Sequence, residues 1–159
     1  MKPATAALPQ GDVALLTSEV AERLLASTEL ARLAYVATDG GPRVMPMLFQ
    51  WTGSELVMST FAGAHKIAAL RAHPAVAVTI DIAGPPPEVL LLRGDVSVTD
   101  VDGVVPEFAL AERRYYGEEQ AAAMLAEIDR PGTKMTRIAL RPAWVGLLDF
   151  QTRFPGARP

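Results

Sequence analysis

The chain has 159 residues, is 50% hydrophobic and carries a formal net charge of −3 at pH 7. This length suits one domain with a single core and is short for two. The sequence contains no strongly basic block, which excludes the usual electrostatic footprint of a nucleic-acid partner. The absence of cysteine excludes disulfides, thiolate metal sites and cysteine nucleophiles.

Both ends of the chain are rich in Pro, Ala and Gly, which predicts flexible tails at residues 1–12 and 155–159. One domain is therefore expected over residues 13–154. The first residues lack the apolar stretch of a secretory signal, and no apolar run is long enough to span a membrane. We expect a cytoplasmic protein without a membrane partner. Two histidines without metal-binding spacing also argue against a metal site.

The first half of the chain predicts a helix, three strands and a second helix. The first helix starts with Thr and Ser and has apolar residues at helical spacing. Asp39, Gly40 and Gly41 suit the positive φ values of a tight hairpin. The predicted elements are a helix at 17–28, strands within 30–51 on either side of the hairpin, a strand at 55–60 and a helix at 63–74.

The second half returns to strands around one helical segment. The wholly apolar run at 75–82 predicts a strand buried on both faces. In the strand at 89–100, Gly94 predicts a bulge or bend that lets a sheet curl. Two helical pieces separated near Gly117 follow at 105–128, and two strands with Pro142 at their corner lie within 134–150.

The order of these elements predicts a mainly β (α+β) fold with six or seven strands. Because hairpins dominate, a mostly antiparallel barrel fits better than a doubly wound parallel sheet. None of the common catalytic or nucleotide-binding motifs is present. An enzyme of this sequence would therefore need an organic cofactor to supply the chemistry.

The best candidate site is the strand end and helix start at residues 59–66. Hydroxyls of Ser59 and Thr60, a glycine-bearing turn and Lys66 in the first helical turn offer short donors, free amides and a cation to a phosphate. The alternative is that the hydroxyls cap the helix and Lys66 is a solvated surface charge. His65 is a further donor to the same phosphate or a polar surface residue.

A second candidate is the strand that contains Pro46. Proline cannot donate to a strand ladder, so this residue marks an edge or a place where the backbone faces something else, such as a planar ring. The alternative is a simple edge strand with alternating apolar side chains. The Arg and Tyr residues at 113–116 could stack on a ring or bind a carboxylate, or could form an exposed helix face and dimer contact.

Residues 33–81 resemble the pyridoxamine 5'-phosphate oxidase-like superfamily of split-barrel flavoproteins. The resemblance lies in the order of LAYVATDGGPRVMPM, a strand ending in STF, and GAHKIAALRAHPAVAVTID. It implies a six-stranded antiparallel split barrel with flanking helices, and a homodimer with cofactor sites at the subunit interface. The cofactor-binding residues that it implies are Met45, Pro46, Met47 and Leu48 beneath the ring, and Ser59, Thr60, His65 and Lys66 at the phosphate.

This chain departs from the true oxidases of that superfamily. Their strand over the flavin begins and ends with a cation, whereas Met45 and Gln50 stand at those positions here, and the paired arginines of their C-terminal signature are absent. These departures argue against vitamin B6 oxidation. The chain looks more like the branch whose members use FMN or the deazaflavin coenzyme F-420, and FMN ranks first because it needs fewer contacts.

The sequence leaves three functions open. The first is a flavin- or deazaflavin-dependent oxidoreductase that transfers a hydride to or from an unidentified small organic substrate. The second is a non-catalytic protein that binds or sequesters flavin or haem, for which His65 and His73 are the available axial ligands. The third is a structural or interaction protein without a ligand.

Overall fold

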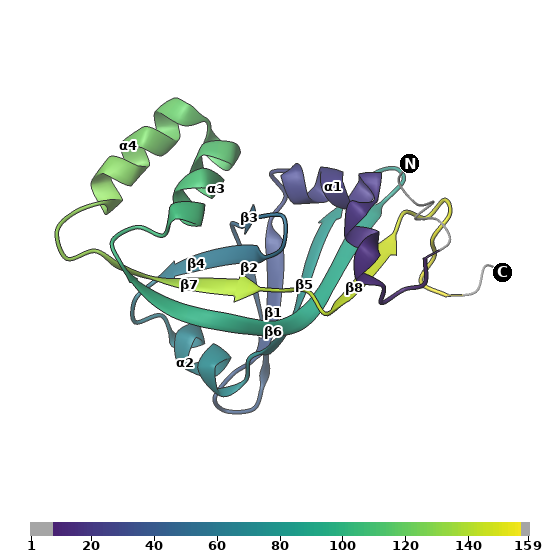
Figure 1. The fold of residues 1–159 in the computed structure, drawn as a ribbon, viewed down its shortest axis with the longest axis horizontal. Helices are drawn as coiled ribbons and strands as arrows, with labels where there is room; N and C mark the ends of the chain where they lie inside the picture. Colours follow the sequence, from purple (N-terminus) through teal and green to yellow (C-terminus); the bar gives the residue numbers. More distant parts are fainter. Residues whose placement is uncertain (1–7, 157–159) are drawn as a thin grey trace.

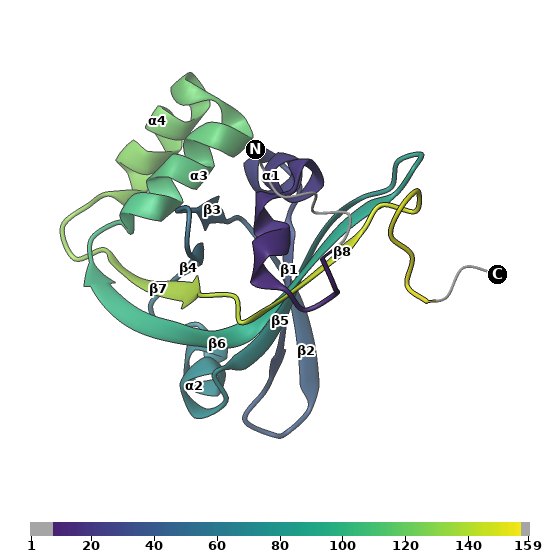
Figure 2. The ribbon, with the colours of Figure 1, turned by 45° about the vertical axis from the view of Figure 1, so that its right-hand side comes forward.

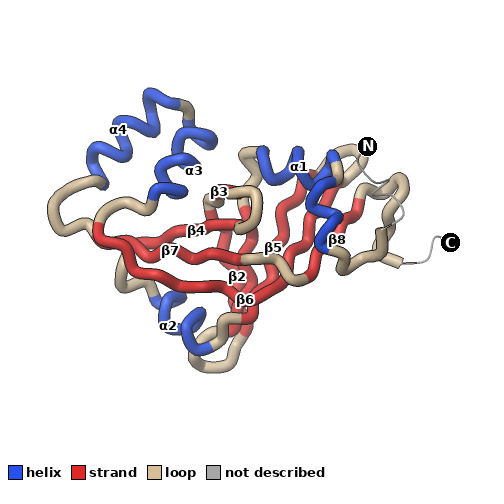
Figure 3. The backbone as a smooth tube through the Cα atoms, in the orientation of Figure 1, coloured by secondary structure: helices blue, strands red, loops and turns tan. Residues whose placement is uncertain are grey.

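Eight strands and four α-helices make up residues 8–156, the part of the chain that the computed structural model describes (Figure 1 and Figure 3). The strands are β1 (Ala31–Val36), β2 (Pro42–Met47), β3 (Gln50–Trp51), β4 (Leu56–Phe61), β5 (Ala75–Ile82), β6 (Glu88–Asp102), β7 (Lys134–Leu140) and β8 (Trp144–Leu148). The helices are α1 (Glu19–Ala26), α2 (His65–Ala72), α3 (Pro106–Tyr116) and α4 (Glu118–Ile128), and a 3₁₀ helix, η2 (Val13–Thr17), precedes α1.

The strands form one antiparallel sheet in the order β2-β1-β5-β6-β7-β4-β3, and β8 pairs with β6. The end strands β2 and β3 do not pair with each other, so the sheet curls without closing. This arrangement confirms the predicted α+β class and split barrel. The described residues contain eight strands where six or seven were expected, because residues 42–51 divide into β2 and the two-residue β3, and β8 is a separate partner of β6.

Strand β6 is 15 residues long and curves through the whole sheet (Figure 2). Its first half pairs with β5 and β8, and its second half, from Val96, pairs with β7. Gly94 lies at this change of neighbours, and its pairing opposite Val76 is regular, so the predicted bulge is not present in this pair. A Cβ on Gly94 would lie 2.7 Å from the carbonyl oxygen of Arg141 in the β7–β8 connection. Glycine lets that connection, which contains Pro142 as predicted, approach β6 closely.

Helix α1 covers the main core on the inner face of the sheet. The Ser18 hydroxyl accepts a hydrogen bond from the Ala21 amide at 3.2 Å and caps the helix, as the Ser/Thr start predicted. Leu24 and Leu25 of α1 are buried in the core cluster. The helix thereby closes one end of the curled sheet, as expected.

The predicted burial of β5 on both faces is wrong. Val76, Val78 and Ile80 are buried in the core, whereas Ala75 and Ala77 on the opposite face are exposed. An antiparallel sheet needs only one covered face, and small alanines leave the outer face of β5 uncovered in this chain. Residues 75–82 therefore form a mainly apolar run because the exposed outer face of β5 also carries apolar side chains.

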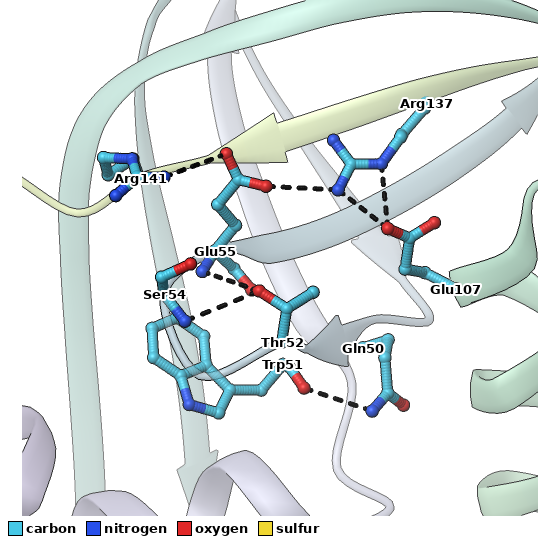
Figure 4. A network of polar contacts seen from close by, with 8 residues as sticks. All are labelled: Gln50, Trp51, Thr52, Ser54, Glu55, Glu107, Arg137 and Arg141. Carbon is cyan, nitrogen blue, oxygen red and sulfur yellow. Dashed lines mark hydrogen bonds and ion pairs between the residues drawn. The ribbon is translucent and has the colours of Figure 1, made fainter.

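Helices α3 and α4 form a hairpin between β6 and β7 (Figure 2). Gly117, with φ +82°, separates them at the predicted position. Figure 4 shows how α3 is tied to the sheet: Arg137 of β7 contacts Glu107 of α3 at 2.7 Å and Glu55 at 3.1 Å. Arg141 contacts the same Glu55 at 3.6 Å.

The residues near both termini are joined to each other and to β8. Gln10 donates to the Leu147 carbonyl at 2.6 Å and accepts from the Leu147 amide at 2.8 Å. Arg153 donates to the Leu8 carbonyl at 2.7 Å. Residues 8–12 of the expected N-terminal tail are thus hydrogen-bonded to the fold, while residues 1–7 and 157–159 lie outside the described part.

Candidate anion and cofactor site

The turn between β4 and α2 ends in a helix start that no side chain caps. Gly63, with φ +87°, allows the turn, and Ala64 is the N-cap residue without a side-chain hydrogen bond. The capping alternative for Ser59 and Thr60 is therefore wrong. Because the first amides of a helix have no intrahelical partner, α2 presents free donors and the positive end of its dipole.

Lys66 lies in the first turn of α2 and carries a charge that no carboxylate neutralises. Its Nζ lies 3.2 Å from the Thr60 Oγ1 atom, and it forms no ion pair within residues 8–156. The side chain is half-buried, and desolvation lowers the pKa of the ammonium group. A half-buried cation beside an uncapped helix start is a ready site for an anion.

A cleft of about 590 Å³ opens beside this helix start. Its charged wall contains two ion pairs, between Arg71 and Asp100 at 2.8 Å and between Lys134 and Asp102 at 3.8 Å. The hydrogen bond from Arg71, followed by that from Thr136, holds the pKa of Asp100 below its usual value. The residues that line the cleft are Thr38, Ala62, Gly63, Ala64, His65, Ile67, Ala68, Arg71, Asp100, Val101, Asp102, Lys134, Met135 and Thr136.

The structure brings Thr60 and Lys66 into contact and places His65 on the wall of the cleft, which neither Thr60 nor Lys66 lines, and it turns Ser59 away from Thr60. Successive residues of a strand point to opposite faces. Ser59 is paired with Arg137, which contacts α3, whereas Thr60 is paired with Thr136 of the cleft wall. The Ser59 Oγ atom is buried without a hydrogen-bond partner in the described chain. A role of Ser59 at the phosphate stays a prediction.

The strand that contains Pro46 is an edge strand, as predicted. Pro46 pairs with Arg32 of β1 on one side, and β2 has no neighbour on the other. Met45 and Pro46 are exposed and Leu48 is half-exposed, whereas the Met47 side chain is buried in the core. A planar ring on this strand would meet Met45, Pro46 and Leu48, and Met47 only through its backbone.

Sequence reasoning missed the far wall of the cleft. Asp100, Lys134 and Thr136 come from β6 and β7, and the β6–β7 pairing brings them beside α2. No local motif contains them. The only signal is the alternation along the two strands, which says which side chains share a face but not which cleft they reach.

The chain was compared with known proteins. A family model described as pyridoxamine 5'-phosphate oxidase matches residues 16–148. No curated protein matches significantly. One similar solved structure, an F420 reductase, is 28% identical and covers 77% of this chain and 93% of its own, with a TM-score of 0.61.

Two further similar structures come from named bacteria. A pyridoxamine 5'-phosphate oxidase-related, FMN binding protein from Nostoc punctiforme is 15% identical, with coverage of 88% of this chain and 87% of its own and a TM-score of 0.61. A heme binding protein from Mycobacterium smegmatis is 19% identical, with coverage of 96% and 57% and a TM-score of 0.60. At such identities the likeness concerns the fold.

No helix within residues 8–156 combines the length and the apolar character needed to cross a membrane. The curled antiparallel sheet and the helix start at Lys66 agree with the order of motifs read from residues 33–81. The family model extends that agreement over most of the chain. This chain belongs to the pyridoxamine 5'-phosphate oxidase family.

Proposed function

We propose that this protein is a flavin- or deazaflavin-dependent oxidoreductase that acts on a small organic substrate. The observation that carries the proposal is the half-buried Lys66 ammonium, which has no carboxylate partner among the described residues and lies beside the uncapped start of α2. A phosphate is an anion of suitable size and charge for this arrangement. Family membership supports the choice of a flavin-type cofactor.

Different residues of the candidate site would bind the phosphate and the ring of such a cofactor. Lys66, the free amides of α2 and the Thr60 hydroxyl would bind the phosphate, and His65 on the cleft wall would add a donor. The exposed edge at Met45 and Pro46 would support the ring, since Pro46 has no N–H group to leave unpaired beneath it. A flavin or deazaflavin supplies the hydride chemistry, so no protein acid or base is required.

The choice between deazaflavin and FMN depends on the comparison with known structures and on the cations available at this site. The 28% identity to an F420 reductase favours the deazaflavin coenzyme F-420, which reverses the order reached from sequence alone. Lys66 and Arg71 are the cations of α2 that could contact the acidic tail of that coenzyme, but Asp100 already binds the Arg71 guanidinium at 2.8 Å. Oxidation of pyridoxamine phosphate is not proposed, because Met45 and Gln50 replace both expected cations.

The test is a pair of titrations of the purified protein, one with FMN and one with coenzyme F-420, followed by quenching of cofactor fluorescence. Lys66→Ala should weaken binding of the preferred cofactor at least tenfold, and Lys66→Arg should restore part of it. Arg113→Ala is the matched control, because it removes a cation that is exposed and paired with Glu118 at 3.2 Å. Absence of binding of both cofactors, or equal binding by Lys66→Ala, would reject the proposal.

We also propose that the protein works as a homodimer with its cofactor sites at the subunit interface. Strand β2 has no neighbouring strand on one side within residues 8–156 and exposes Val44 and Met45. A shallow apolar groove of about 450 Å³ continues from β2 across β1, β5 and β6. An unpaired edge strand and a continuous apolar surface are features that a second copy would cover.

Sequestration of haem is the second candidate, because His65 is exposed on the wall of the cleft. Haem requires an axial ligand, and imidazole is a common one. Titration with haemin should then give a Soret band that shifts in His65→Ala and not in His73→Ala. An unliganded interaction protein would show no response of any titration to Lys66→Ala.

A further inference from the structure

A second cleft lies at the other end of β2 from the cleft beside α2. It has a volume of about 620 Å³ and is bounded by η2, α1, β3 and α3. Its apolar wall includes Val13, Leu16, Leu25 and Trp51. Arg114 of α3 supplies the cation of the opposite wall. The cleft thus combines an apolar surface with one guanidinium group.

The Arg114 guanidinium is held firmly but its charge is not neutralised. It donates to the carbonyls of Ser27, at 3.1 Å, and Phe49, and to the side-chain oxygen of Gln50. It forms no ion pair with any described residue, so its partners are all neutral oxygens. Three of its five N–H donors are used in these bonds, and the Tyr115 side chain is a further hydrogen-bond partner of the guanidinium.

The rings around Arg114 fix the plane of the guanidinium. Its central carbon lies 4.8 Å from the centre of the Phe49 ring and 4.9 Å from that of Tyr115. Tyr115 is anchored in turn by its hydroxyl, which donates to the Glu29 carbonyl at 2.6 Å. A cation held in this way is preorganised for a ligand and loses little side-chain entropy on binding.

Strand β2 connects the two clefts. The β1–β2 hairpin contributes Thr38 to the cleft beside α2, and the chain then runs from Pro42 to Gln50 and Trp51 in the second cleft (Figure 1 and Figure 2). These eight residue steps span at most about 26 Å at the usual rise of a strand. A ring placed along β2, as the proposed function has it, would therefore lie between the hairpin end of this strand and the second cleft.

We propose that the second cleft binds an apolar, aromatic molecule that carries one anionic group, with Arg114 as its counter-charge. Trp51 and Leu16 would contact the apolar body, and the charge of the Arg114 guanidinium, which lines the cleft, would attract the anion. Arg114 is the cation among the lining residues, so a ligand with a single negative charge is favoured over a polyanion. Taken with the proposed function, on which this last step rests, that molecule is the substrate.

The test uses a fluorescent apolar anion, 8-anilinonaphthalene-1-sulfonate, and its neutral relative N-phenyl-1-naphthylamine, without any cofactor. The chain has two tryptophans, so Trp144→Phe leaves Trp51 as the sole donor for energy transfer to the bound probe. Transfer from Trp51 is expected for both probes. Its absence for the anionic probe would overturn the proposal.

Two variants in the Trp144→Phe background test separately the charge of Arg114 and the space available in the cleft. Arg114→Met should weaken binding of the anionic probe about tenfold and leave the neutral probe within about twofold. Ala26→Phe should block both probes, because Ala26 is exposed at the cleft and a phenyl ring there reduces its volume. Ala122→Phe, on an exposed position of α4 away from the cleft, is the matched control.

Equal affinity of Arg114→Met for the anionic probe, or unchanged binding in Ala26→Phe, would overturn the proposal. Ala26→Phe leaves the anchoring bonds of Arg114 in place, so it remains informative if Arg114→Met does not fold. Loss of the proposed cofactor binding would remove the substrate assignment but leave these probe measurements unaffected.

Discussion

The Lys66 ammonium costs the folded protein stability as long as no anion lies beside it. Burial withdraws water from the charge, and the one hydrogen bond it makes goes to the neutral Thr60 hydroxyl. A charge kept in such a place without a partner is typical of a functional site rather than of a structural one. Binding and stability should therefore respond in opposite directions to its removal.

The variant Lys66→Met is expected to raise the stability of the ligand-free protein by up to about 1 kcal/mol, discounted for partial exposure. The folded state lowers the pKa of Lys66, so the unfolded chain binds more protons as the pH approaches 10.5. The free energy of unfolding of the wild type should therefore increase relative to that of the variant as the pH rises in this range. Urea unfolding at pH 7 and pH 10 measures both effects, and a less stable variant at pH 7 would contradict them.

A second residue, Asp149, stabilises the turn that follows β8. Burial raises its pKa, but hydrogen bonds from the Thr152 hydroxyl and from three amides outweigh this and lower the pKa to about 2. The stabilisation is present above the unfolded pKa of 3.8 and is lost as the pH falls toward 2. Asp149→Asn should cost about 1 kcal/mol at pH 7, allowing for solvent screening, and much less at pH 2. Thermal unfolding at both pH values checks this, and a cost independent of pH would be contrary evidence.

At the level of elements, the connection between α3 and the sheet depends on Arg137. This residue joins Glu107 of α3 to Glu55 at the start of β4, and all three side chains are mostly buried (Figure 4). The hydrogen bond from Arg137 keeps the pKa of Glu107 below its usual value despite partial burial. Helix α3 also carries Arg114, so the same attachment positions the wall of the second cleft.

Replacing Arg137 with Met should therefore destabilise the protein by about 1–3 kcal/mol at pH 7, because the partly buried Glu107 loses its partner and Glu55 keeps only Arg141 at 3.6 Å among the described residues. Since the pKa of Glu107 is lowered in the fold, the stabilisation exists above its unfolded value of 4.5 and fades as the pH falls through its folded value. The destabilisation caused by Arg137→Met should therefore become smaller below pH 4. Arg113→Met, at an exposed pair with Glu118, is the control and should change stability by less than about 0.5 kcal/mol.

For the molecule as a whole, the uncovered outer face of the sheet is the main feature without a partner in this chain. Val36 of β1 and Val44 of the edge strand β2 are exposed at 38% and 65%, next to the exposed Ala75 and Ala77 of β5. This surface continues the edge on which the proposed cofactor ring would lie. Assembly and cofactor binding should therefore be linked.

A charge placed on this surface tests the proposed dimer. Val44→Glu should convert the dimer to a monomer in light scattering after size exclusion, because a buried carboxylate without a partner is costly. The monomer should also bind the cofactor at least tenfold more weakly, since its site would be incomplete. Val13→Glu, at a 47% exposed valine on η2, is a control expected to remain dimeric. A monomeric wild type would reject the proposed dimer.

The sequence predicted those parts of the fold that depend on local signals. The hairpin at 39–41, the Ser18 cap, the break at Gly117 and the corner at Pro142 each follow from the conformational preference of one or two residues. The two-face burial of β5 failed because an apolar run does not show whether its second face meets a helix, a partner or water.

The candidate site shows the same difference between local signals and long-range pairing. Thr60, His65 and Lys66 are close in sequence and were found from one segment. The cleft wall from β6 and β7, and the cleft around Arg114, depend on pairings between distant segments that no local pattern encodes. The sequence placed Arg114 in a helix but could not show which carbonyls its guanidinium reaches.

The length of β6 affects how the domain unfolds. Because this strand is hydrogen-bonded to β5 and β8 along one half and to β7 along the other, neither side of the barrel can separate without breaking the ladder that it shares. Amide protons of residues 90–98 should thus exchange with solvent only when the entire domain unfolds, whereas those of the α3–α4 hairpin should exchange through smaller local openings. A single strand would then set the unit of cooperative unfolding, while the helices around the second cleft keep the freedom to admit a ligand.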